Sequence, residues 1–279
     1  MRLFRRFSSD YNMTKVTFTK MVASGNDFVV LDRLPRGRPA SLVRAICERR
    51  YGIGADGLLL LEKSKKADIR MRIFNADGSE AQMCGNGARC AVLWVSRQAG
   101  IKKSGINLET KAGIITSRIL GDKVQIKLTE PRNLKLDFAL KINRRALHLS
   151  FINTGVPHAV VFSEGLKNID VLNLGRQLRY HQYFSPGGTN VDFVEPLNRN
   201  AIRVRTYERG VEDETLACGT GSVASALIFA LKANANNMIN VYTKSTEVLK
   251  VYFERSGSHF KNVWLEGKAR IVYQGAYYV

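Results

Sequence analysis

Alternation of apolar and polar positions runs through most of this chain and predicts a protein made largely of β-strands. Side chains that alternate in this way point to opposite faces of a sheet in turn. The segment ILGDKVQIKL holds two such runs joined by Gly121-Asp122, which predicts a hairpin. The other predicted strands are KVTFTKMV, DFVVLD, IRMRIFN and GIITSRIL in the first half, and LHLSFINTG, HAVVF, NVDFVEPL, AIRVRTYE, VLKVYFE and KARIVYQG in the second.

Two segments of helical length are apolar on every side. They span residues 86–98 and 220–232, and each follows a Cys-Gly-x-Gly sequence. A helix without a polar face must be buried all round, and these segments are shorter than the roughly 20 residues that cross a membrane. We therefore predict a central helix wrapped by a curled, mostly antiparallel β-sheet in each half of the chain. Weaker helices are expected at 39–50 and 171–180, and Gly100 is expected to end the first buried helix.

The two halves of the chain resemble each other in sequence. IRMRIFN begins at residue 69 and IRVRTYE at residue 202, an offset of 133, while Cys84 and Cys218 of the two Cys-Gly-x-Gly segments are 134 apart. NDFVV in the first half also resembles NVDFV in the second. A repeat of this period predicts two pseudo-symmetric α/β domains, with a boundary near Pro131.

We expect the first domain at residues 13–130 and the second at 131–267. Residues 1–12 are interpreted as a flexible extension or a mis-assigned start, because a second candidate start, Met13, comes just before the first predicted strand.

The composition is that of a soluble globular protein, with 45% hydrophobic and 24% charged residues among 279. The basic N-terminus lacks the apolar segment of a secretory signal, so we expect a cytoplasmic protein with no membrane partner. The net charge of +19 would suit a nucleic-acid-binding protein, which is the alternative from a different functional class. Because the Lys and Arg residues are scattered and no binding motif accompanies them, we interpret the charge as a surface property and expect no nucleic-acid partner.

The cysteines, Cys47, Cys84, Cys90 and Cys218, show no metal-binding pattern. No pair has C-x-x-C spacing and no histidines cluster near them, so we expect no metal. No lysine motif indicates pyridoxal phosphate, and no buried strand precedes the GTGSVA segment as a dinucleotide-binding fold requires. We therefore expect no cofactor. Cys90 lies inside the first apolar helix and is interpreted as a core residue.

Cys84 and Cys218 each stand where a buried helix is predicted to begin. Unpaired N–H groups and the helix dipole at that position are expected to lower the pKa of a thiol, from about 8.5 to between roughly 3.5 and 7.5. The glycines that follow leave the backbone open to an anion such as a carboxylate. If the duplicated domains face each other, one thiolate can take a proton from a carbon while the opposite thiol returns one, which inverts that carbon. The sequence thus predicts a two-base racemase or epimerase.

From about residue 14 to its end, the chain resembles the diaminopimelate epimerase family. The motifs that carry the resemblance are GNDFVV, FNADGSEAQMCGNGARC, TGVPHAV, TNVDFV and YERGVEDETLACGTG, in this order. The resemblance implies two pseudo-symmetric domains, each a curled sheet around a central helix, with the C-terminal strand at 268–279 returning to the first domain. It also implies a homodimer that interconverts LL- and meso-diaminopimelate without pyridoxal phosphate, in lysine and peptidoglycan-precursor synthesis.

The resemblance assigns roles to individual positions. It makes Cys84 and Cys218 the acid–base pair, with His158 and Glu208 as further catalytic residues; His158 would tune or orient the thiols. The remaining positions are Gly85, Asn86, Gly219 and Thr220 for the backbone groups that hold the reacting carboxylate, and Asn26, Asn75, Asn190, Glu208 and Arg209 for substrate contacts by side chains.

Two positions depart from the family pattern. Many members carry Gln at Gly57 and Asn at Val156, and neither residue present here can make the corresponding side-chain contact. The difference concerns the end of the substrate far from the reacting carbon. A related two-thiol racemase of another amino acid therefore remains the nearest alternative.

Overall fold

The computed structural model describes residues 14–34, 39–98 and 103–279. The predictions for residues 1–12 and for Gly100 lie outside these residues. The strands are β1 (Lys15–Ala23), β2 (Asn26–Leu31), β3 (Gly57–Glu62), β4 (Ile69–Asn75), β5 (Glu80–Ala81), β6 (Asn107–Thr110), β7 (Gly113–Leu120), β8 (Lys123–Lys127), β9 (Arg132–Ile142), β10 (Arg145–Asn153), β11 (Pro157–Phe162), β12 (Asn190–Asn198), β13 (Ala201–Glu208), β14 (Asp213–Thr215), β15 (Met238–Tyr242), β16 (Val248–Ser256), β17 (His259–Lys268) and β18 (Arg270–Tyr278). The α-helices are α1 (Pro39–Cys47), α2 (Gly85–Ser96), α3 (Val171–Arg179) and α4 (Gly219–Lys232), and two short 3-10 helices are Leu166–Asn168 and Gln182–Phe184.

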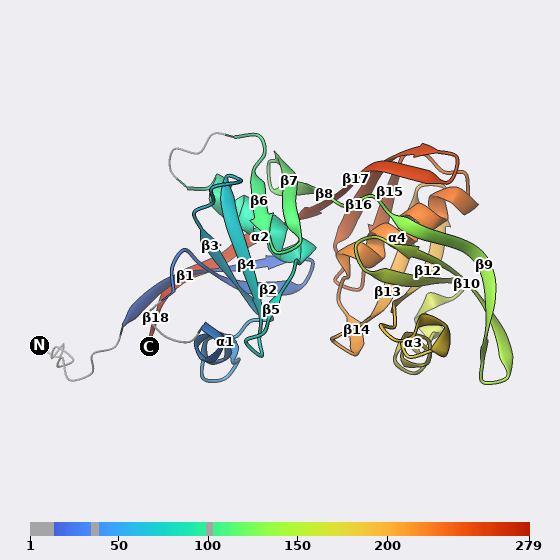
Figure 1. The fold of residues 1–279 in the computed structure, drawn as a ribbon, viewed down its shortest axis with the longest axis horizontal. Coiled ribbons are helices and arrows are strands. Elements are labelled where there is room, and N and C mark those ends of the chain that lie inside the picture. Colours follow the sequence, from blue (N-terminus) through green and yellow to red (C-terminus); the bar gives the residue numbers. More distant parts are fainter. Residues whose placement is uncertain (1–13, 35–38, 99–102) are drawn as a thin grey trace, which may run out of the picture.

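Two lobes lie side by side, and each wraps a curled sheet around one helix (Figure 1). The first lobe surrounds α2 and the second surrounds α4. Nine of the twelve residues of α2 and ten of the fourteen of α4 are buried, as their all-round apolar sequences require. The predicted fold class, a mixed α/β protein with curled sheets and few helices, is confirmed.

The strands pair in the same order in both lobes. In the first lobe, antiparallel β1–β2 leads to parallel β2–β3, then to β4 with its partners β5 and β6. In the second, antiparallel β10–β11 leads to parallel β11–β12, then to β13 with β14 and β15. The two lobes therefore have equivalent topologies, as the internal duplication predicts.

One element of the predicted repeat is wrong. NDFVV lies in β2 and NVDFV in β12, but the pairing order makes β2 the counterpart of β11 and β3 the counterpart of β12. Both segments combine a polar start with buried apolar residues, which is common to strands that enter a core. Their similarity reflects local burial rather than equivalent positions.

The outer strand beside the first strand of each repeat comes from a different part of the sequence in the two lobes. β18, the last strand, pairs antiparallel with β1, and β9 occupies the matching place beside β10 in the second lobe. In addition, β8 pairs with β17, so strands from both halves of the sequence share one sheet. The division at residue 131 stays a prediction.

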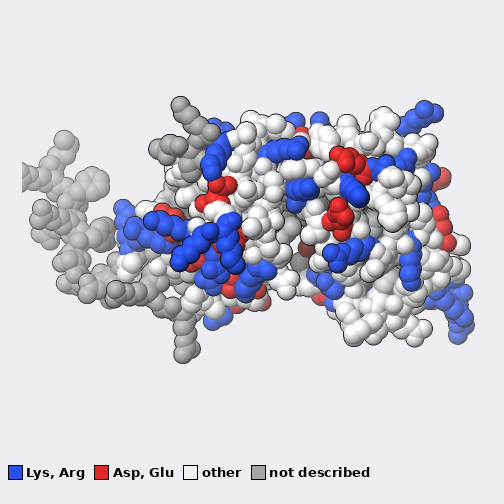
Figure 2. Space-filling model, turned by 45° about the horizontal axis from the view of Figure 1, so that its top comes forward, with Lys and Arg blue, Asp and Glu red and all other residues white. Residues whose placement is uncertain are grey.

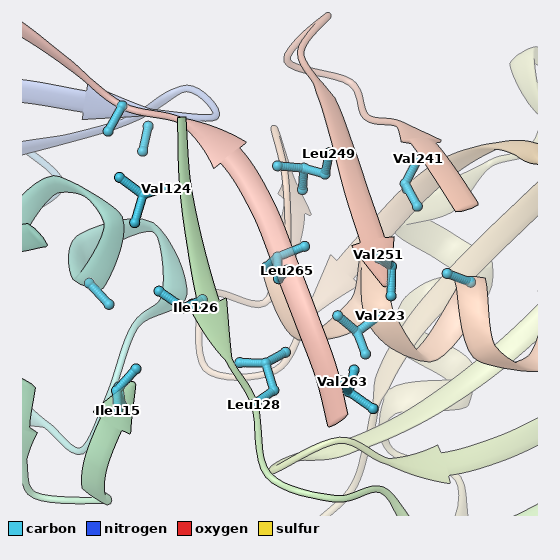
Figure 3. Packing of buried hydrophobic residues seen from close by; sticks show 14 of the residues in the cluster. Ile115, Val124, Ile126, Leu128, Val223, Val241, Leu249, Val251, Val263 and Leu265 are labelled. Atoms are coloured by element: carbon cyan, nitrogen blue, oxygen red, sulfur yellow. The ribbon is translucent and has the colours of Figure 1, made fainter. Parts of the chain in front are cut away.

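The apolar core continues from one lobe to the other. Ile126 of β8 is paired in register with Leu265 of β17, Val124 lies on the same strand as Ile126, and Val223 of α4 lies on the other side of β17 from β8 (Figure 3). All four side chains are almost completely buried. The N-termini of α2 and α4 are therefore held through one packed core.

Basic side chains are spread over both lobes on the face shown in Figure 2, with acidic side chains between them. Several arginines are paired, for example Arg205 with Glu214 at 2.6 Å and Arg72 with Glu80 at 3.0 Å. This face shows no single continuous basic stripe of the kind that follows a nucleic-acid backbone.

Candidate active site

A cavity of about 1370 Å³ lies where the two lobes meet, and both predicted catalytic cysteines line it. Residues from strands, loops and helix N-termini of both lobes line this cavity. Of the predicted site residues, His158 alone does not line it. Those that do are Asn26, Asn75, Cys84, Gly85, Asn86, Asn190, Glu208, Arg209, Cys218, Gly219 and Thr220.

Cys84 is the N-cap residue of α2. Its backbone is extended, and its sulfur accepts a hydrogen bond from the N–H of Gly87 at 3.5 Å. A Cβ at Gly87 would meet Leu59 Cδ2 at 3.0 Å, so the glycine lets α2 pack closely on β3. The first turn of a helix leaves N–H groups without partners inside the helix, and Gly85 and Asn86 of this turn line the cavity.

Cys218 is the N-cap residue of α4, in the same extended conformation. The sulfur of Cys218 lies 3.4 Å from the Thr220 hydroxyl oxygen. Cys218 is 7% exposed, whereas Cys84 is half-buried. A Cβ at Gly221 would lie only 2.3 Å from Asp192 Oδ1. Gly221 therefore lets the Asp192 carboxylate approach the first turn of α4.

Burial raises the pKa of the Cys84 thiol, and it raises the pKa of the Cys218 thiol well above its ordinary value. The Glu208 carboxylate adds to both shifts, and Asp192 adds to that of Cys218; backbone N–H groups of the helix turns act in the opposite direction. The predicted lowering of the thiol pKa is therefore wrong for this structure. Loss of hydration in the closed interface outweighs the helix N-terminus.

His158 reaches Cys218 through one hydroxyl. Its Nε2 lies 3.0 Å from Thr220 Oγ1, and its Nδ1 lies 2.7 Å from Asp192 Oδ2. A carboxylate only accepts hydrogen bonds, so Nδ1 carries a hydrogen. With a neutral imidazole, Nε2 then accepts from Thr220, whose oxygen accepts from the Cys218 thiol. His158 thus lies behind Cys218, outside the cavity wall.

Asp192 is a residue that the sequence analysis missed. It is completely buried and also accepts a hydrogen bond from Thr206 Oγ1 at 2.7 Å. The available signal was a carboxylate in the middle of the apolar run NVDFV, because a buried carboxylate needs partners.

Glu208 stands at the end of β13 and lines the cavity near both thiols. Burial raises the pKa of its carboxyl group, and Asp192 adds to the shift while His158 opposes it. A carboxyl group with a raised pKa can exchange protons at a higher pH than usual.

Several predicted substrate contacts are already fixed by the protein. Asn190 accepts from the Arg209 N–H at 2.8 Å and donates to Pro157 O at 3.0 Å. Asn75 donates to Ser79 Oγ at 3.0 Å. Within the described part of the chain, the Arg209 side chain makes one hydrogen bond, to Gly187 O at 3.2 Å, which leaves most of its guanidinium donors for a ligand.

Gly57 and Val156 both line the cavity. A Cβ at Gly57 would lie 2.6 Å from Phe74 O, so a longer side chain requires a shifted backbone here. Arg49 and Asp56, which the sequence analysis missed, line the same wall and form an ion pair at 2.7 Å. The wall at this end is therefore charged although Gly57 contributes no side chain.

Among residues 14–34, 39–98 and 103–279, no three His, Cys, Asp or Glu side chains are grouped closely enough to hold a metal ion. None of the helices there is both long and apolar enough to cross a membrane.

Comparison with known proteins places this site in a family. The family model described as diaminopimelate epimerase matches residues 18–133 and 150–272. Diaminopimelate epimerase of Aquifex aeolicus is 41% identical over 273 residues, covering 92% of this chain and 96% of that protein. The protein of the same name from Chlorobaculum tepidum is 42% identical over 261 residues, covering 91% and 98%.

Solved structures show the same fold at low sequence identity. A PhzF-family phenazine biosynthesis protein of Bacillus anthracis superposes with a TM-score of 0.73 at 17% identity, covering 96% of this chain and all of that one. A hydroxyproline epimerase of Agrobacterium vitis gives 0.71 at 14% identity, covering 96% and 93%. The extent and identity of the sequence matches show that the chain belongs to the diaminopimelate epimerase family.

Proposed function

We propose that the chain is an epimerase that interconverts LL- and meso-diaminopimelate through the thiols of Cys84 and Cys218, without a cofactor. The observation that carries the proposal is the placement of these cysteines as the N-caps of two buried helices that meet at one cavity. The family membership supports the substrate, since the relatives with the names given above are diaminopimelate epimerases.

The reaction needs one proton removed and one returned. A thiolate takes the proton from the α-carbon, so the C–H bond breaks and an S–H bond forms. The thiol on the opposite face then gives its proton to the same carbon, and the configuration inverts. Negative charge that develops on the α-carbon and its carboxylate is stabilised by the N–H groups at the starts of α2 and α4, where Gly85, Asn86, Gly219 and Thr220 lie.

The raised thiol pKa fits this chemistry. An α-proton beside a carboxylate is weakly acidic, and a sulfur with a raised pKa is a stronger base once it is ionised. Glu208 lies close enough to both sulfurs to affect the pKa of each. We propose that the Glu208 carboxylate influences which of the two sulfurs carries the proton, and that His158 orients Cys218 through Thr220.

At the other end of the substrate, the guanidinium of Arg209 is proposed to bind the second carboxylate with a two-pronged contact. Asn75 and Asn190 complete the wall around it, and Asn26, which is hydrogen-bonded to Asn86 at the start of α2, is proposed to contact the substrate at the reacting end. Because Gly57 and Val156 provide no hydrogen-bonding side chain, we propose that Arg49, Asp56 or bridging water satisfies the remaining polar groups of that end.

A homodimer is part of the proposal. β18 pairs with β1 along one edge, and its other edge has no strand partner among the described residues. Val272, Tyr273 and Tyr278 on this strand are exposed. An unpaired strand with apolar side chains suits association with a second copy. We also propose a cytoplasmic location, because the reaction requires reduced thiols.

Incubation of the enzyme with LL-diaminopimelate in deuterated water tests the proposal. We expect conversion to the meso form with deuterium incorporated at one α-carbon. Cys90→Ala is the matched control, because Cys90 lies in the core of the same helix as Cys84, and it should retain the reaction. Absence of both conversion and deuterium incorporation in the folded wild type would contradict the function.

The alternative substrate class is decided by the distal contacts. The values of kcat/KM for diaminopimelate, lysine, ornithine, histidine and glutamate should be compared in the wild type and in Arg209→Lys. We expect diaminopimelate to be preferred, and Arg209→Lys to reduce that preference because a point charge does not replace the planar fork. Equal turnover of a substrate without the second carboxylate would favour a racemase of another amino acid.

A further inference from the structure

Arg89 is a buried cation behind the N-terminus of α2. Its side chain is 0% exposed, and its Nη2 donates to Ser24 Oγ at 2.8 Å and to Asn86 Oδ1 at 2.7 Å. Among the described residues, its Nε and Nη1 have no hydrogen-bond partner and no carboxylate forms an ion pair with it. A guanidinium keeps its proton in proteins. The core therefore contains a positive charge that is only partly compensated, a costly arrangement unless it serves the site.

The fold keeps room for this side chain. A Cβ at Gly267 of β17 would lie 2.9 Å from the guanidinium carbon of Arg89 and 2.6 Å from Leu249 Cδ2. A methyl group at Gly267 would therefore displace Arg89. The corresponding position on α4 is Val223, an ordinary core residue, so the cation belongs to the Cys84 half alone.

A chain of directed hydrogen bonds runs from Arg89 along the cavity wall. Asn86 Nδ2 donates to Asn26 Oδ1 at 3.1 Å, and Asn26 Nδ2 donates to Asp56 Oδ2 at 2.7 Å. Arg89 at one end can only donate and the Asp56 carboxylate at the other end can only accept. These two ends impose one orientation on both amides, with each oxygen toward Arg89 and each nitrogen toward Asp56.

This orientation determines what the wall offers to a ligand. An amide nitrogen carries two hydrogens, and each asparagine uses one of them within the chain. The other hydrogen remains for the cavity, which both Asn26 and Asn86 line. Two N–H donors beside the open first turn of α2 suit a carboxylate and do not suit an ammonium group.

We propose, building on the proposed epimerase function, that Arg89 is a positioning residue for the Cys84 half of the site. Arg89 holds Asn86 and Asn26 as donors to the reacting carboxylate of the substrate. It also supplies positive charge where the Cys84 thiolate and this carboxylate carry negative charge. These two anions compensate the charge of the Arg89 guanidinium.

The charged and titratable groups around this pair are few. Cys84, Cys90 and Glu247 act on Arg89, and Glu208 and Arg89 act on Cys84. Burial raises the pKa of Cys90 far above the working range, so it stays a thiol. Glu247 accepts a hydrogen bond from the Ser24 N–H at 2.9 Å. Arg89 lowers the pKa of Cys84 while Glu208 raises it, so loss of Arg89 should move that pKa upward.

Arg89→Met tests the proposal, because it removes the charge and keeps a long side chain. Alkylation by iodoacetamide is followed between about pH 8 and pH 11, with Cys84 and Cys218 measured separately by peptide mass spectrometry. We expect the midpoint for Cys84 to rise by about one pH unit. Cys218, on which Arg89 does not act, is the internal control, and its rate of alkylation should be unchanged at every pH. The value of kcat/KM for LL-diaminopimelate should fall about tenfold or more.

Arg89→Lys separates charge from orientation. Lysine keeps the positive charge but lacks the planar guanidinium whose Nη2 donates to both Ser24 and Asn86, so we expect a nearly unchanged Cys84 midpoint and a raised KM. This variant decides the question if Arg89→Met does not fold. Wild-type KM and an unchanged midpoint in Arg89→Lys would then overturn the positioning role.

The alkylation profile does not depend on the substrate. If the wild type does not act on diaminopimelate, the proposed function fails, yet a shifted Cys84 midpoint still supports the role of Arg89. If the wild type is active while folded Arg89→Met keeps both its midpoint and its kcat/KM, the inference about Arg89 is overturned and the proposed function stands.

Discussion

The starts of α2 and α4 have the same backbone and different surroundings. Both begin with an N-capping cysteine in extended conformation followed by Gly-x-Gly. Behind Cys84 lie Asn86 and the buried cation Arg89; behind Cys218 lie Thr220 and the buried His158–Asp192 pair. Duplication thus supplied the geometry of the pair, and later side-chain differences gave each thiol its own electrostatic environment.

This difference bears on a reaction that needs two opposite roles. Cys218 faces the carboxylates of Glu208 and Asp192, whereas Cys84 faces Glu208 and the guanidinium of Arg89. Negative neighbours oppose a thiolate and a positive neighbour favours it. We therefore expect Cys84 to ionise before Cys218 in the free enzyme.

Replacement of either Cys84 or Cys218 is the strongest test of the proposal that the two thiols act together. Cys84→Ala and Cys218→Ala should each reduce epimerisation of diaminopimelate to background, because one sulfur cannot serve both faces of the carbon. Optical rotation of the product measures the effect. Cys47→Ala, at a buried cysteine on α1, should retain most activity. Substantial turnover by either of the first two variants would refute the two-base mechanism.

The next test removes the hydrogen-bonded link from Cys218 through Thr220 to His158. Thr220→Val keeps the shape of the side chain but removes the hydroxyl that joins Cys218 to His158, so we expect kcat to fall about hundredfold with a smaller change in KM. Steady-state kinetics in both directions measures this effect. Thr110→Val is the control, because Thr110 is a buried threonine that does not line the cavity, and its hydroxyl donates to Gly113 O at 2.8 Å. A wild-type kcat in Thr220→Val would remove His158 from the mechanism.

The positions of the two helices could be predicted because their sequences permit only one environment. Segments apolar on every side, each preceded by Cys-Gly-x-Gly, match α2 and α4 closely at their N-termini. The placement of both cysteines on one cavity followed from duplication, since equivalent helices in facing lobes bring equivalent residues together.

The electrostatics could not be predicted in the same way. The pKa of a thiol depends on water excluded by the opposite lobe, and no local pattern reports that exclusion. Asp192 and Arg89 each look like an isolated polar residue in an apolar run. Their importance comes from partners distant in sequence, namely His158 and Thr206 for Asp192, and Ser24 for Arg89.

Chemical labelling measures the asymmetry directly. Because burial raises the pKa of both thiols, each stays protonated at neutral pH, and its reactive thiolate increases as pH rises toward and beyond about 9. We expect iodoacetamide to label Cys84 several times faster than Cys218 at about pH 8.5, as measured by peptide mass spectrometry. Epimerase activity should rise over the same alkaline range. Faster labelling of Cys218 would reverse the assignment of roles.

The smallest effect is expected from alanine substitution of Gly87 and Gly221, the glycines at matching positions of the two turns. A methyl group at Gly221 would lie 2.3 Å from Asp192 Oδ1, whereas one at Gly87 would first meet the end of the Leu59 side chain at 3.0 Å. Alanine favours a helix over glycine by up to about 1 kcal/mol, and overpacking costs about 1–3 kcal/mol. Gly87→Ala should therefore leave the free energy of unfolding nearly unchanged.

Gly221→Ala should instead lower that free energy by about 1–2 kcal/mol, because the buried Asp192 carboxylate is held by His158 and Thr206 and has little freedom to move. It should also reduce kcat, since a displaced Asp192 no longer fixes His158 behind Thr220. Urea unfolding and steady-state kinetics on the two variants check both expectations. Equal loss of stability and activity in Gly87→Ala and Gly221→Ala would show that the two turns tolerate a methyl group alike, and that the close approach of Asp192 does not distinguish them.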